Sequence, residues 1–391
     1  MLSSVELSVI GAVAAALFAA AVVAFITTPV VRSLAFKVGA VDVPRDNRRM
    51  HKHPIPRMGG LAIFFGFILS ALIFIPLTTP LRGMLLGAVV IVILGIFDDI
   101  YALPAMPKFL IQILAALIAV LMGNRIDILS NPNIFSSDPY WVLGWLSIPI
   151  SVIWIVGITN AVNLIDGLDG LACGVSTISS MTMLVIALTV AEPEVALLMA
   201  ALSGGCIGFL PYNLNPAKIF MGDTGSTFLG FILAVVSIQG LFKSYAIISF
   251  AVPFLMLGLP IFDTCFAIFR RVSHGQSPMA PDRGHIHHRL IDMGFSQKQA
   301  VAVLYVISAI LGLSAVLLTT TSVLKAMMVL LALCVAGGLS AKLYLDRVNH
   351  RETPDSPAQD GAPARPRKLR QPPGDVAGND YFFGEEERSD K

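Results

Sequence analysis

Residues 5–29 read VELSVIGAVAAALFAAAVVAFITTP, and this stretch decides the class of fold. A helix needs about 20 mainly apolar residues to cross a bilayer, because each backbone N–H and C=O in hydrocarbon must be paired within the helix. No basic segment precedes the run and no A-x-A-like cleavage site follows it, so we do not expect a signal peptide. The run predicts a spanning helix.

The rest of the chain repeats this composition. Of the 391 residues, 55% are hydrophobic and only 13% are charged, against about 25% charged in soluble proteins, and the mean hydropathy is +0.78. Eleven apolar runs cover residues 5–29, 59–77, 81–97, 108–122, 142–160, 171–190, 195–212, 226–242, 246–269, 300–319 and 324–343. We therefore expect an all-α polytopic membrane protein with about 11 transmembrane helices.

The basic residues are distributed unevenly between the two sets of connecting loops. Lys and Arg accumulate in loops that stay in the cytoplasm. With eleven crossings, 23 of the 27 basic residues fall on the side that holds the C-terminus, and the other side holds Arg82, Arg125, Lys243 and Lys325. We therefore expect the N-terminus outside and the C-terminus in the cytoplasm.

The end of the chain differs in composition from the rest. Residues 346–391 are rich in Pro, Gly and charge, and they include RPRKLR at 365–370. Such a segment cannot bury a core. We expect a transmembrane domain over residues 1–345, with catalytic loops on the cytoplasmic side, and a disordered cytoplasmic tail over residues 346–391.

Polar residues concentrate in five strings, all on the side expected to be cytoplasmic. Ionisable residues near membrane depth are costly, so they are functional candidates. The first string, RDNRRMHKHPIPRMGG at 45–60, carries Lys52 and Arg57 and suits an anion. Anchoring by the positive-inside rule is an equal alternative for any single Arg here. The Gly pair favours a ligand, because Gly permits close backbone approach.

The second string, FDDIYALPAMPK at 97–108, places Asp98 and Asp99 at the end of an apolar run. Adjacent carboxylates repel, so such a pair is expected to hold a divalent cation, to lie near a cation, or to share a proton. A solvated helix end is the less favoured alternative, because carboxylates at a helix C-terminus oppose the helix dipole.

The third string, NAVNLIDGLDGLA at 160–172, spaces Asn160, Asn163, Asp166 and Asp169 three residues apart. Residues at this spacing share a helix face, although the glycines of the string favour a turn for its later members. Carboxylate and amide oxygens are the ligands that Mg²⁺ prefers when phosphates and water complete its shell. A turn that merely ends a helix is the alternative, but one acid would be enough for it.

The fourth string, NPAKIFMGDTGS at 215–226, sets Asp223 in a Gly-bracketed turn before an apolar run. Exposed N–H groups at helix starts and in Gly turns attract phosphate. Asp223 beside them is explained if a metal lies between it and the phosphate. An N-cap role is the competing account, and both roles are compatible.

The fifth string, RRVSHGQSPMAPDRGHIHHRLIDMG at 270–294, carries His285, His287, His288 and Arg289. The H-x-H-H pattern could bind zinc, but no Cys accompanies it and the neighbouring Arg residues oppose a cation. Hydrogen bonding to phosphate or sugar fits better. Together the five strings describe phosphoryl transfer between a soluble diphosphate and a lipid. There is no Walker A sequence to support ATP coupling.

Taken in order, HKHPIPRMGG, FDD, NAVNLIDGLDGLA, FMGDTGS and GHIHHRL resemble the polyprenyl-phosphate N-acetylhexosamine-1-phosphate transferases, glycosyltransferase family 4, over residues 5–345. PRMGG and PDRGHIHHRL resemble the bacterial undecaprenyl-phosphate GlcNAc-1-phosphate transferase branch. The peptidoglycan branch, which uses UDP-N-acetylmuramoyl-pentapeptide, typically reads PTMGG and ranks second. A transporter is the alternative from another class, but the acids lie at helix ends on one face rather than at the midplane.

The resemblance implies transfer of GlcNAc 1-phosphate from UDP-GlcNAc to undecaprenyl phosphate with release of UMP, the first membrane step of an envelope glycan such as O-antigen or teichoic acid. It implies a multi-pass protein of the bacterial inner membrane with a cytoplasmic active site. The expected partners are UDP-GlcNAc, undecaprenyl phosphate, the bilayer and a second copy in a homodimer, with no nucleic acid. The implied roles are catalysis by Asp98 and Asp99, binding of Mg²⁺ (with Mn²⁺ as the alternative) by Asn163 and Asp223, and substrate binding by Lys52, Arg57, Asn160, Asp166, Asp169, His285, His287, His288 and Arg289.

Overall fold

A computed structural model describes residues 4–43, 53–130, 140–240, 251–277 and 284–320. All of these residues belong to one compact unit, residues 1–337. The apolar run expected at 324–343, the tail expected at 346–391 and Lys52 lie outside the described residues.

The described part of the chain is built almost entirely from helices, which confirms the predicted all-α fold. The two small antiparallel sheets pair β1 with β2 and β3 with β4. In chain order the elements are α1 (Ser4–Val38), β1 (Val41–Asp42), β2 (Ile55–Pro56), α2 (Gly60–Phe74), α3 (Thr79–Tyr101), α4 (Ala105–Leu121), β3 (Ile128–Ser130), β4 (Tyr140–Val142), the 3-10 helix η1 (Gly144–Leu146), α5 (Ser147–Leu164), α6 (Leu171–Thr189), α7 (Pro193–Asn213), α8 (Gly222–Gly240), α9 (Ala251–Met256), α10 (Gly258–Ser273), α11 (Ile286–Asp292) and α12 (Gln297–Thr320).

Six of the described helices are long and apolar enough to cross a membrane: α1, α3, α5 with η1, α6, α7 and α12. Two shorter apolar helices, α2 and α4, coincide with further predicted runs. The protein is therefore a multi-pass membrane protein. Each predicted run within the described residues contains a helix, but the boundaries shift by several residues, most of all in α1, which continues to Val38.

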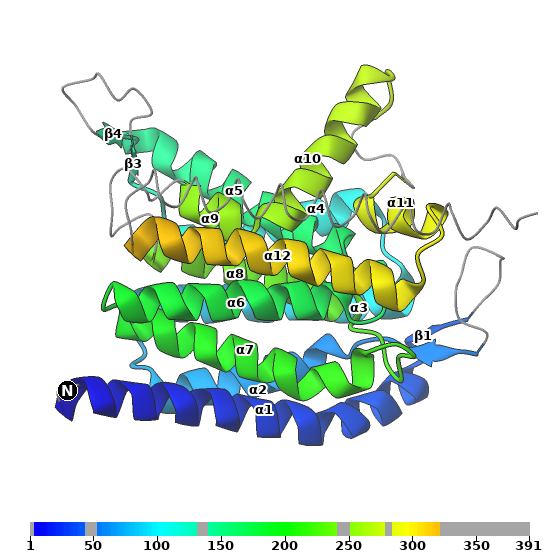
Figure 1. The fold of residues 1–391 in the computed structure, drawn as a ribbon, viewed down its shortest axis with the longest axis horizontal. Coiled ribbons are helices and arrows are strands. Elements are labelled where there is room, and N and C mark those ends of the chain that lie inside the picture. The colour runs from blue at the N-terminus through cyan, green and yellow to red at the C-terminus, as the bar shows by residue number, and fades with distance from the viewer. Residues whose placement is uncertain (1–3, 44–52, 131–139, 241–250, 278–283, 321–391) are drawn as a thin grey trace, which may run out of the picture. The chain divides into compact units, whose positions relative to one another are not determined.

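One predicted span is interrupted in the structure. The run at 246–269 was expected as one span, but the structure breaks it at Leu257 into α9 and α10. Pro260 explains the break, because proline has no N–H to donate to the carbonyl of residue 256 and is tolerated only in the first turn of a helix. The second segment, α10, leaves the direction of the other helices (Figure 1).

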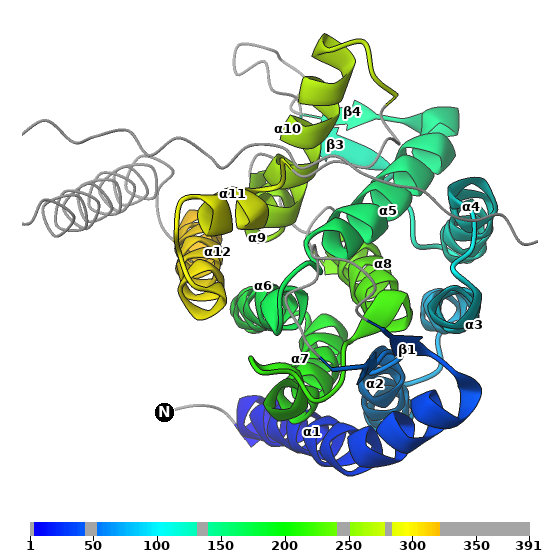
Figure 2. The same cartoon turned by 90° about the vertical axis from the view of Figure 1, so that its right-hand side faces the viewer.

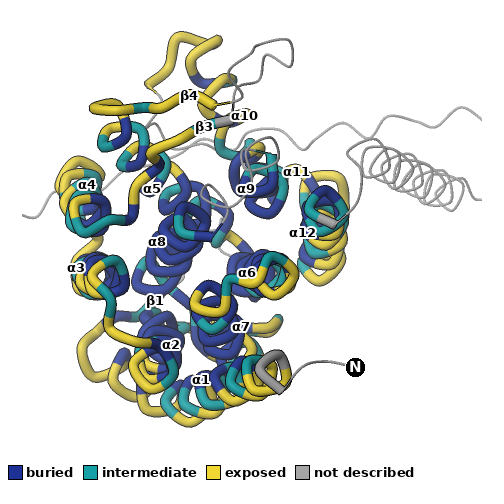
Figure 3. Tube along the Cα trace, turned by 90° about the vertical axis from the view of Figure 1, so that its left-hand side faces the viewer, coloured by how far each residue is buried: buried dark blue, intermediate teal, exposed yellow. Residues whose placement is uncertain are grey.

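Helix α8 lies at the centre of the described bundle, surrounded by α2, α3, α5, α6 and α7 (Figure 2). Every residue from 224 to 238 is buried, as the dark tube of α8 shows (Figure 3). Glycines allow the neighbouring helices to approach this closely. A Cβ atom on Gly60 or Gly95 would meet the backbone of α8, and a Cβ atom on Gly230 of α8 would meet the backbone of α5.

The polar strings meet at one end of this bundle. Helices α1, α3, α5 and α7 end there, and α2, α4, α6 and α8 begin there (Figure 1). The same end carries the β1–β2 hairpin and α11. The described parts of all five strings are thus brought to a common region, as the sequence predicted.

Candidate functional site

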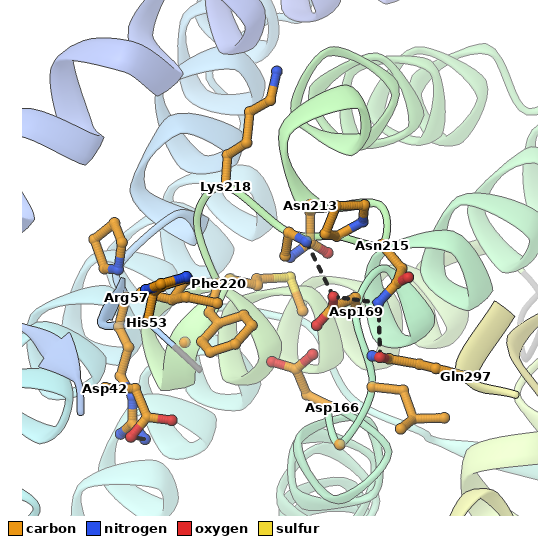
Figure 4. Close-up of a pocket in the computed structure, with 18 of the residues that line it drawn as sticks. Asp42, His53, Arg57, Asp166, Asp169, Asn213, Asn215, Lys218, Phe220 and Gln297 are labelled. Atoms are coloured by element: carbon orange, nitrogen blue, oxygen red, sulfur yellow. Dashed lines mark hydrogen bonds and ion pairs between the residues drawn. The ribbon is translucent and has the colours of Figure 1, made fainter. Parts of the chain in front are cut away.

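A cavity of about 870 Å³ opens at this end of the bundle (Figure 4). This volume is within the range of small-molecule sites, roughly 300–1,000 Å³. Its walls come from the β1–β2 hairpin, the α5–α6 turn, the α7–α8 loop and the α11–α12 segment. The polar side chains that line it are those of Arg32, Asp42, His53, Arg57, Asp99, Asp166, Asp169, Asn213, Asn215, Lys218, Asp223, His288, Asp292 and Gln297.

Asp98, Asp99, Lys108 and Asp223 form a group that we call the acidic cluster, and two of its members, Asp99 and Asp223, line the cavity. The Lys108 Nζ atom lies 2.8 Å from Asp98 Oδ2 and 3.2 Å from Asp223 Oδ2. The backbone folds locally to allow this, because Ala102 is left-handed at the end of α3 and the Leu103 N–H donates to Asp98 Oδ1 over 2.7 Å. Lys108 therefore joins the ends of three helices through one ammonium group.

Asp99 caps α8 from a different helix. Its Oδ1 accepts the Asp223 N–H over 3.0 Å, and its Oδ2 accepts both the N–H and the Oγ1–H of Thr224, over 3.1 and 2.6 Å. The first N–H groups of a helix have no partner within it, and a carboxylate satisfies them well. The N-cap role considered for Asp223 therefore falls to Asp99. Asp223 lies in the first turn of α8, and it lines the cavity.

Asn163, in the last turn of α5, also contacts the start of α8. Its Nδ2 donates to Ser226 Oγ over 2.9 Å, and that hydroxyl donates to the Gly222 carbonyl over 3.1 Å. The two predicted metal ligands, Asn163 and Asp223, are thus placed at the same helix start. Their role as metal ligands stays a prediction.

The oxygen atoms of the side chains at the start of α8 determine whether Mg²⁺ can bind there. Among the described residues, no group of three or more His, Cys, Asp or Glu side chains is arranged to hold a metal ion. Mg²⁺ is often bound through only one or two carboxylates, with substrate phosphates and water completing its octahedral shell. Asp223 with the Asn163 amide fits this mode of binding, and does not fit a cage built from protein ligands alone.

A second group consists of Asp166, Gly167, Asp169, Asn215 and His287, which we call the loop cluster; all of these except His287 line the cavity. Asp169 Oδ2 accepts hydrogen bonds from Asn215 Nδ2 over 2.8 Å and from the Ala217 N–H over 3.0 Å. Asn215 Nδ2 also donates to Gln297 Oε1 over 2.7 Å, as Figure 4 shows. Asp169 therefore connects the α5–α6 turn to the α7–α8 loop through hydrogen bonds.

Asp166 is the group whose protonation differs most from that of an ordinary acid in the loops. Burial first, and then the negative charges of Asp223 and Asp99, raise the pKa of Asp166 to about 8. It lines the cavity. With that pKa, Asp166 keeps its proton at neutral pH and can donate a hydrogen bond as well as accept one.

The histidine string is divided among three environments. His288 lines the cavity. His287 is buried and packs directly on Gly167, where any Cβ atom would meet its ring. Burial first, and then the charge of His288, lower the pKa of His287 to about 4, so its ring is neutral at pH 7. His285 is buried beside Asp263, and its Nδ1 lies 2.8 Å from Asp263 Oδ2.

The other predicted substrate residues differ in their access to the cavity. Arg57 lines it and pairs with Asp42 over 3.1 Å. Asn160 is outside the lining, and its Nδ2 donates to Gln112 Oε1 over 2.7 Å. The guanidinium of Arg289 lies 5.5 Å from the centre of the Phe266 ring, also outside the lining.

Sequence reasoning missed several polar residues of this region. Asn215 binds both Asp169 and Gln297, and Asp263 binds His285, yet Asn215, Gln297 and Asp263 were not singled out from the sequence. Asp263 carried a usable signal, because it is the one acid within the apolar run 246–269 and such acids are costly at membrane depth. Lys108 was not among the predicted site residues, and its contacts place it between Asp98 and Asp223.

The sequence is similar to those of known proteins. The family model described as glycosyl transferase family 4 matches residues 81–241. The chain is 45% identical over 311 residues to the "Probable undecaprenyl-phosphate N-acetylglucosaminyl 1-phosphate transferase" of Bacillus subtilis (strain 168), covering 79% of this chain and 86% of that protein.

Two further relatives are more distant. A decaprenyl-phosphate N-acetylglucosaminephosphotransferase of Mycolicibacterium smegmatis is 35% identical over 329 residues, covering 76% of this chain and 79% of that protein. A phospho-N-acetylmuramoyl-pentapeptide-transferase of Staphylococcus aureus (strain JH9) is 32% identical over 282 residues, covering 68% of this chain and 85% of that protein. The extent and level of these similarities show that the chain belongs to glycosyl transferase family 4.

Proposed function

We propose that this protein transfers N-acetylglucosamine 1-phosphate from UDP-GlcNAc to undecaprenyl phosphate, giving undecaprenyl-diphospho-GlcNAc and UMP. The observation that carries the proposal is the acidic cluster, in which Lys108 joins Asp98 to Asp223 beside a cavity large enough for a sugar nucleotide. The relative that is 45% identical is named for this reaction.

The cavity supplies contacts suited to the soluble donor. Arg57 and His288 offer positively charged or donating groups to the diphosphate and the sugar, and Asp166 offers a neutral donor. The start of α8, whose first N–H groups face the acidic cluster, favours negative charge nearby. We propose that the diphosphate lies between Asp223 and Arg57, and that the loop cluster contacts the uridine or the sugar.

The reaction needs one bond made and one bond broken at the sugar-bearing phosphorus of UDP-GlcNAc. An oxygen of the lipid phosphate attacks this phosphorus, and the bond to the bridging oxygen breaks, so that UMP leaves with that oxygen. Asn163 and Asp223 would hold Mg²⁺ (or Mn²⁺), which when bound neutralises the charge of the diphosphate. Lys108 lies where it can hold the attacking phosphate or the leaving UMP.

A general base is not required by this scheme. A phosphate monoester has a second pKa of about 6, so the lipid phosphate is largely a dianion at neutral pH. Asp98 then contributes by holding Lys108, through the 2.8 Å contact, rather than by removing a proton. Asp99 contributes by fixing the first turn of α8 and with it Asp223.

The proposal also includes the cellular location and the membrane orientation of the protein. The bacterial relatives, together with the uneven distribution of Lys and Arg, support the inner membrane, with the acidic cluster on the cytoplasmic face, the N-terminus outside and about 11 crossings. A homodimer remains a prediction. The product would begin an envelope glycan; the sugar, the lipid carrier and the diphosphate linkage suit polymers that are built on the membrane.

Peptidoglycan synthesis is the second candidate, because a phospho-N-acetylmuramoyl-pentapeptide-transferase is 32% identical. The proposed reaction is tested with purified protein, Mg²⁺, undecaprenyl phosphate and either UDP-GlcNAc or UDP-N-acetylmuramoyl-pentapeptide. We expect UMP and a lipid-linked sugar from UDP-GlcNAc only. Release of UMP from the pentapeptide substrate alone would establish the second candidate, and sugar-nucleotide uptake into vesicles without UMP release would indicate a transporter.

A further inference from the structure

One face of α10 holds the start of the histidine string. Asp263, Phe266 and Arg270 are three and four residues apart, so they lie on the same side of the helix. Arg270 Nη1 donates to the Gly284 carbonyl over 2.9 Å, and the Phe266 ring lies against Arg289. Asp263, 3% exposed, contacts the residues between these two points. This face of α10 therefore contacts the segment 284–289 at its start, in its middle and at its end.

Asp263 makes the most specific of these contacts. Its Oδ1 accepts the Ile286 N–H over 2.8 Å, and its Oδ2 lies 2.8 Å from His285 Nδ1. An ionised carboxylate can only accept hydrogen bonds, so His285 Nδ1 must carry a hydrogen in this pair. In the neutral imidazole the other ring nitrogen, Nε2, is then the unprotonated one. Asp263 thus selects both the orientation and the tautomer of His285.

The orientation of His285 is passed on to the cavity through ring contacts. The rings of His285 and His287 are stacked with centroids 5.8 Å apart and planes 8° apart, and the His287 and His288 centroids are 4.2 Å apart. His287 packs on Gly167, next to Asp166 in the α5–α6 turn. His288 lines the cavity, which Asp263 and His285 do not reach.

We infer that Asp263 is a positioning residue, which acts through His285 to hold the histidine string against the α5–α6 turn and so keeps the sugar-nucleotide wall of the cavity in shape. The inference deepens the proposed function and rests on it. It assigns Asp263 to binding of the donor and not to the chemistry, since no atom of Asp263 faces the cavity. The affinity for UDP-GlcNAc should therefore depend on Asp263 more than the turnover rate does.

The test is Asp263→Asn in the full-length purified enzyme. The amide keeps the size of the side chain, and its oxygen can still accept the Ile286 N–H. Its NH₂ group then faces His285 Nδ1, which must become an acceptor, so the hydrogen moves to Nε2. We expect KM for UDP-GlcNAc to rise about tenfold while kcat falls less than about threefold. The midpoint of thermal unfolding should remain close to that of the wild type.

A double variant separates positioning through His285 from a general effect on the fold. If Asp263 acts through His285, Asp263→Asn should add less than about twofold to the KM of His285→Ala, because coupled residues are not additive. Asp127→Asn is the control, since Asp127 likewise contacts other side chains, those of Arg125 and Ser147, but lies between α4 and β3 at the other end of the bundle. It should leave KM unchanged.

Three outcomes overturn the inference: an unchanged KM in Asp263→Asn, the same rise in KM in Asp127→Asn, or a full additional rise on His285→Ala. If Asp263→Asn does not fold, Arg270→Met replaces it, because this change removes the donor to Gly284 from the other end of the same face. It should raise KM about threefold, and an unchanged KM overturns the inference as well. Absence of UMP release by the wild type would instead refute the proposed function, so the two failures are distinguishable.

Discussion

The carboxylates of the acidic cluster and those of the loop cluster have different binding partners. In the acidic cluster, two of the three aspartates share the ammonium group of Lys108, and the third accepts backbone N–H groups at the start of α8. In the loop cluster, Asp169 is bound by an amide and a backbone N–H, and Asp166 keeps a proton. The acidic cluster therefore contains a cation among its carboxylates, and the loop cluster contains none. We propose that the acidic cluster serves the transfer of the phosphoryl group and that the loop cluster gives the cavity its shape.

The comparison is tested most severely by Asp223→Asn. The amide retains an oxygen for Lys108 but loses the negative charge that a metal and the start of α8 require. We expect kcat to fall about 10³-fold, equivalent to about 4 kcal/mol, with little change in the midpoint of thermal unfolding. Turnover is measured as UMP release at saturating substrates. Wild-type turnover in this variant would remove Asp223 from the reaction, and Asp127→Asn serves as the control for loss of a carboxylate elsewhere.

Lys108→Met should produce the next largest effect. The change removes the cation between Asp98 and Asp223 while preserving most of the apolar stem. We expect a fall in kcat of about 10²-fold, with partial recovery in Lys108→Arg, because the guanidinium restores the charge but not the compact geometry. Equal activity of the Met and Arg variants would show that the charge of Lys108 is unimportant.

The loop cluster predicts an effect of pH on stability. The pKa of His287 is lowered from 6.5 to about 4 in the folded protein, so the unfolded chain binds the proton more readily. Stability should therefore be full above pH 6.5 and decline as the pH falls towards 4, by about 2–3 kcal/mol between pH 7 and pH 4.5. Thermal unfolding in detergent measures this loss. His287→Gln should show a smaller decline, and an equal decline in both proteins would assign the effect to other groups.

Gly167→Ala should produce the smallest effect, confined to the shape of the cavity. The new Cβ atom would meet the ring of His287, which is buried and cannot move aside freely. We expect KM for UDP-GlcNAc to rise about tenfold, or about 1.4 kcal/mol, with kcat nearly unchanged. Gly157→Ala in α5 is the matched control, because a Cβ atom there meets nothing within 4 Å. A fall in kcat without a rise in KM would contradict the different roles proposed for the acidic cluster and the loop cluster.

Much of the fold could be predicted from the apolar runs. In hydrocarbon the backbone N–H and C=O groups must be hydrogen-bonded to each other, and a helix achieves this within a single run. The placement of acids at helix ends followed as well, since the strings interrupt those runs. The break at Leu257 was not predicted, although Pro253 and Pro260 lie within the run. Two prolines are compatible with a kinked span, so their number alone did not distinguish a kink from a break.

The contacts within the site were less predictable. Asp99 caps a helix 124 residues further along the chain, and Asn215 binds Gln297 from 82 residues away. Such pairs depend on which helices are neighbours, and helices that are apolar on all sides carry little information about their neighbours. Spacing therefore singled out Asn163, and the Gly-bracketed turn singled out Asp223, but neither pattern could show that Asp99 and Asp169 bind backbone groups.

The burial of α8 on every side has a consequence for the lipid surroundings. A helix with no face toward the bilayer cannot rotate or slide unless the helices around it move too. A movement of the start of α8, where Asp223 lies, therefore involves the helices that are packed around α8. A mismatch between bilayer thickness and the outer helices strains those helices first. We therefore expect turnover to vary with the thickness of the bilayer in which the enzyme is reconstituted.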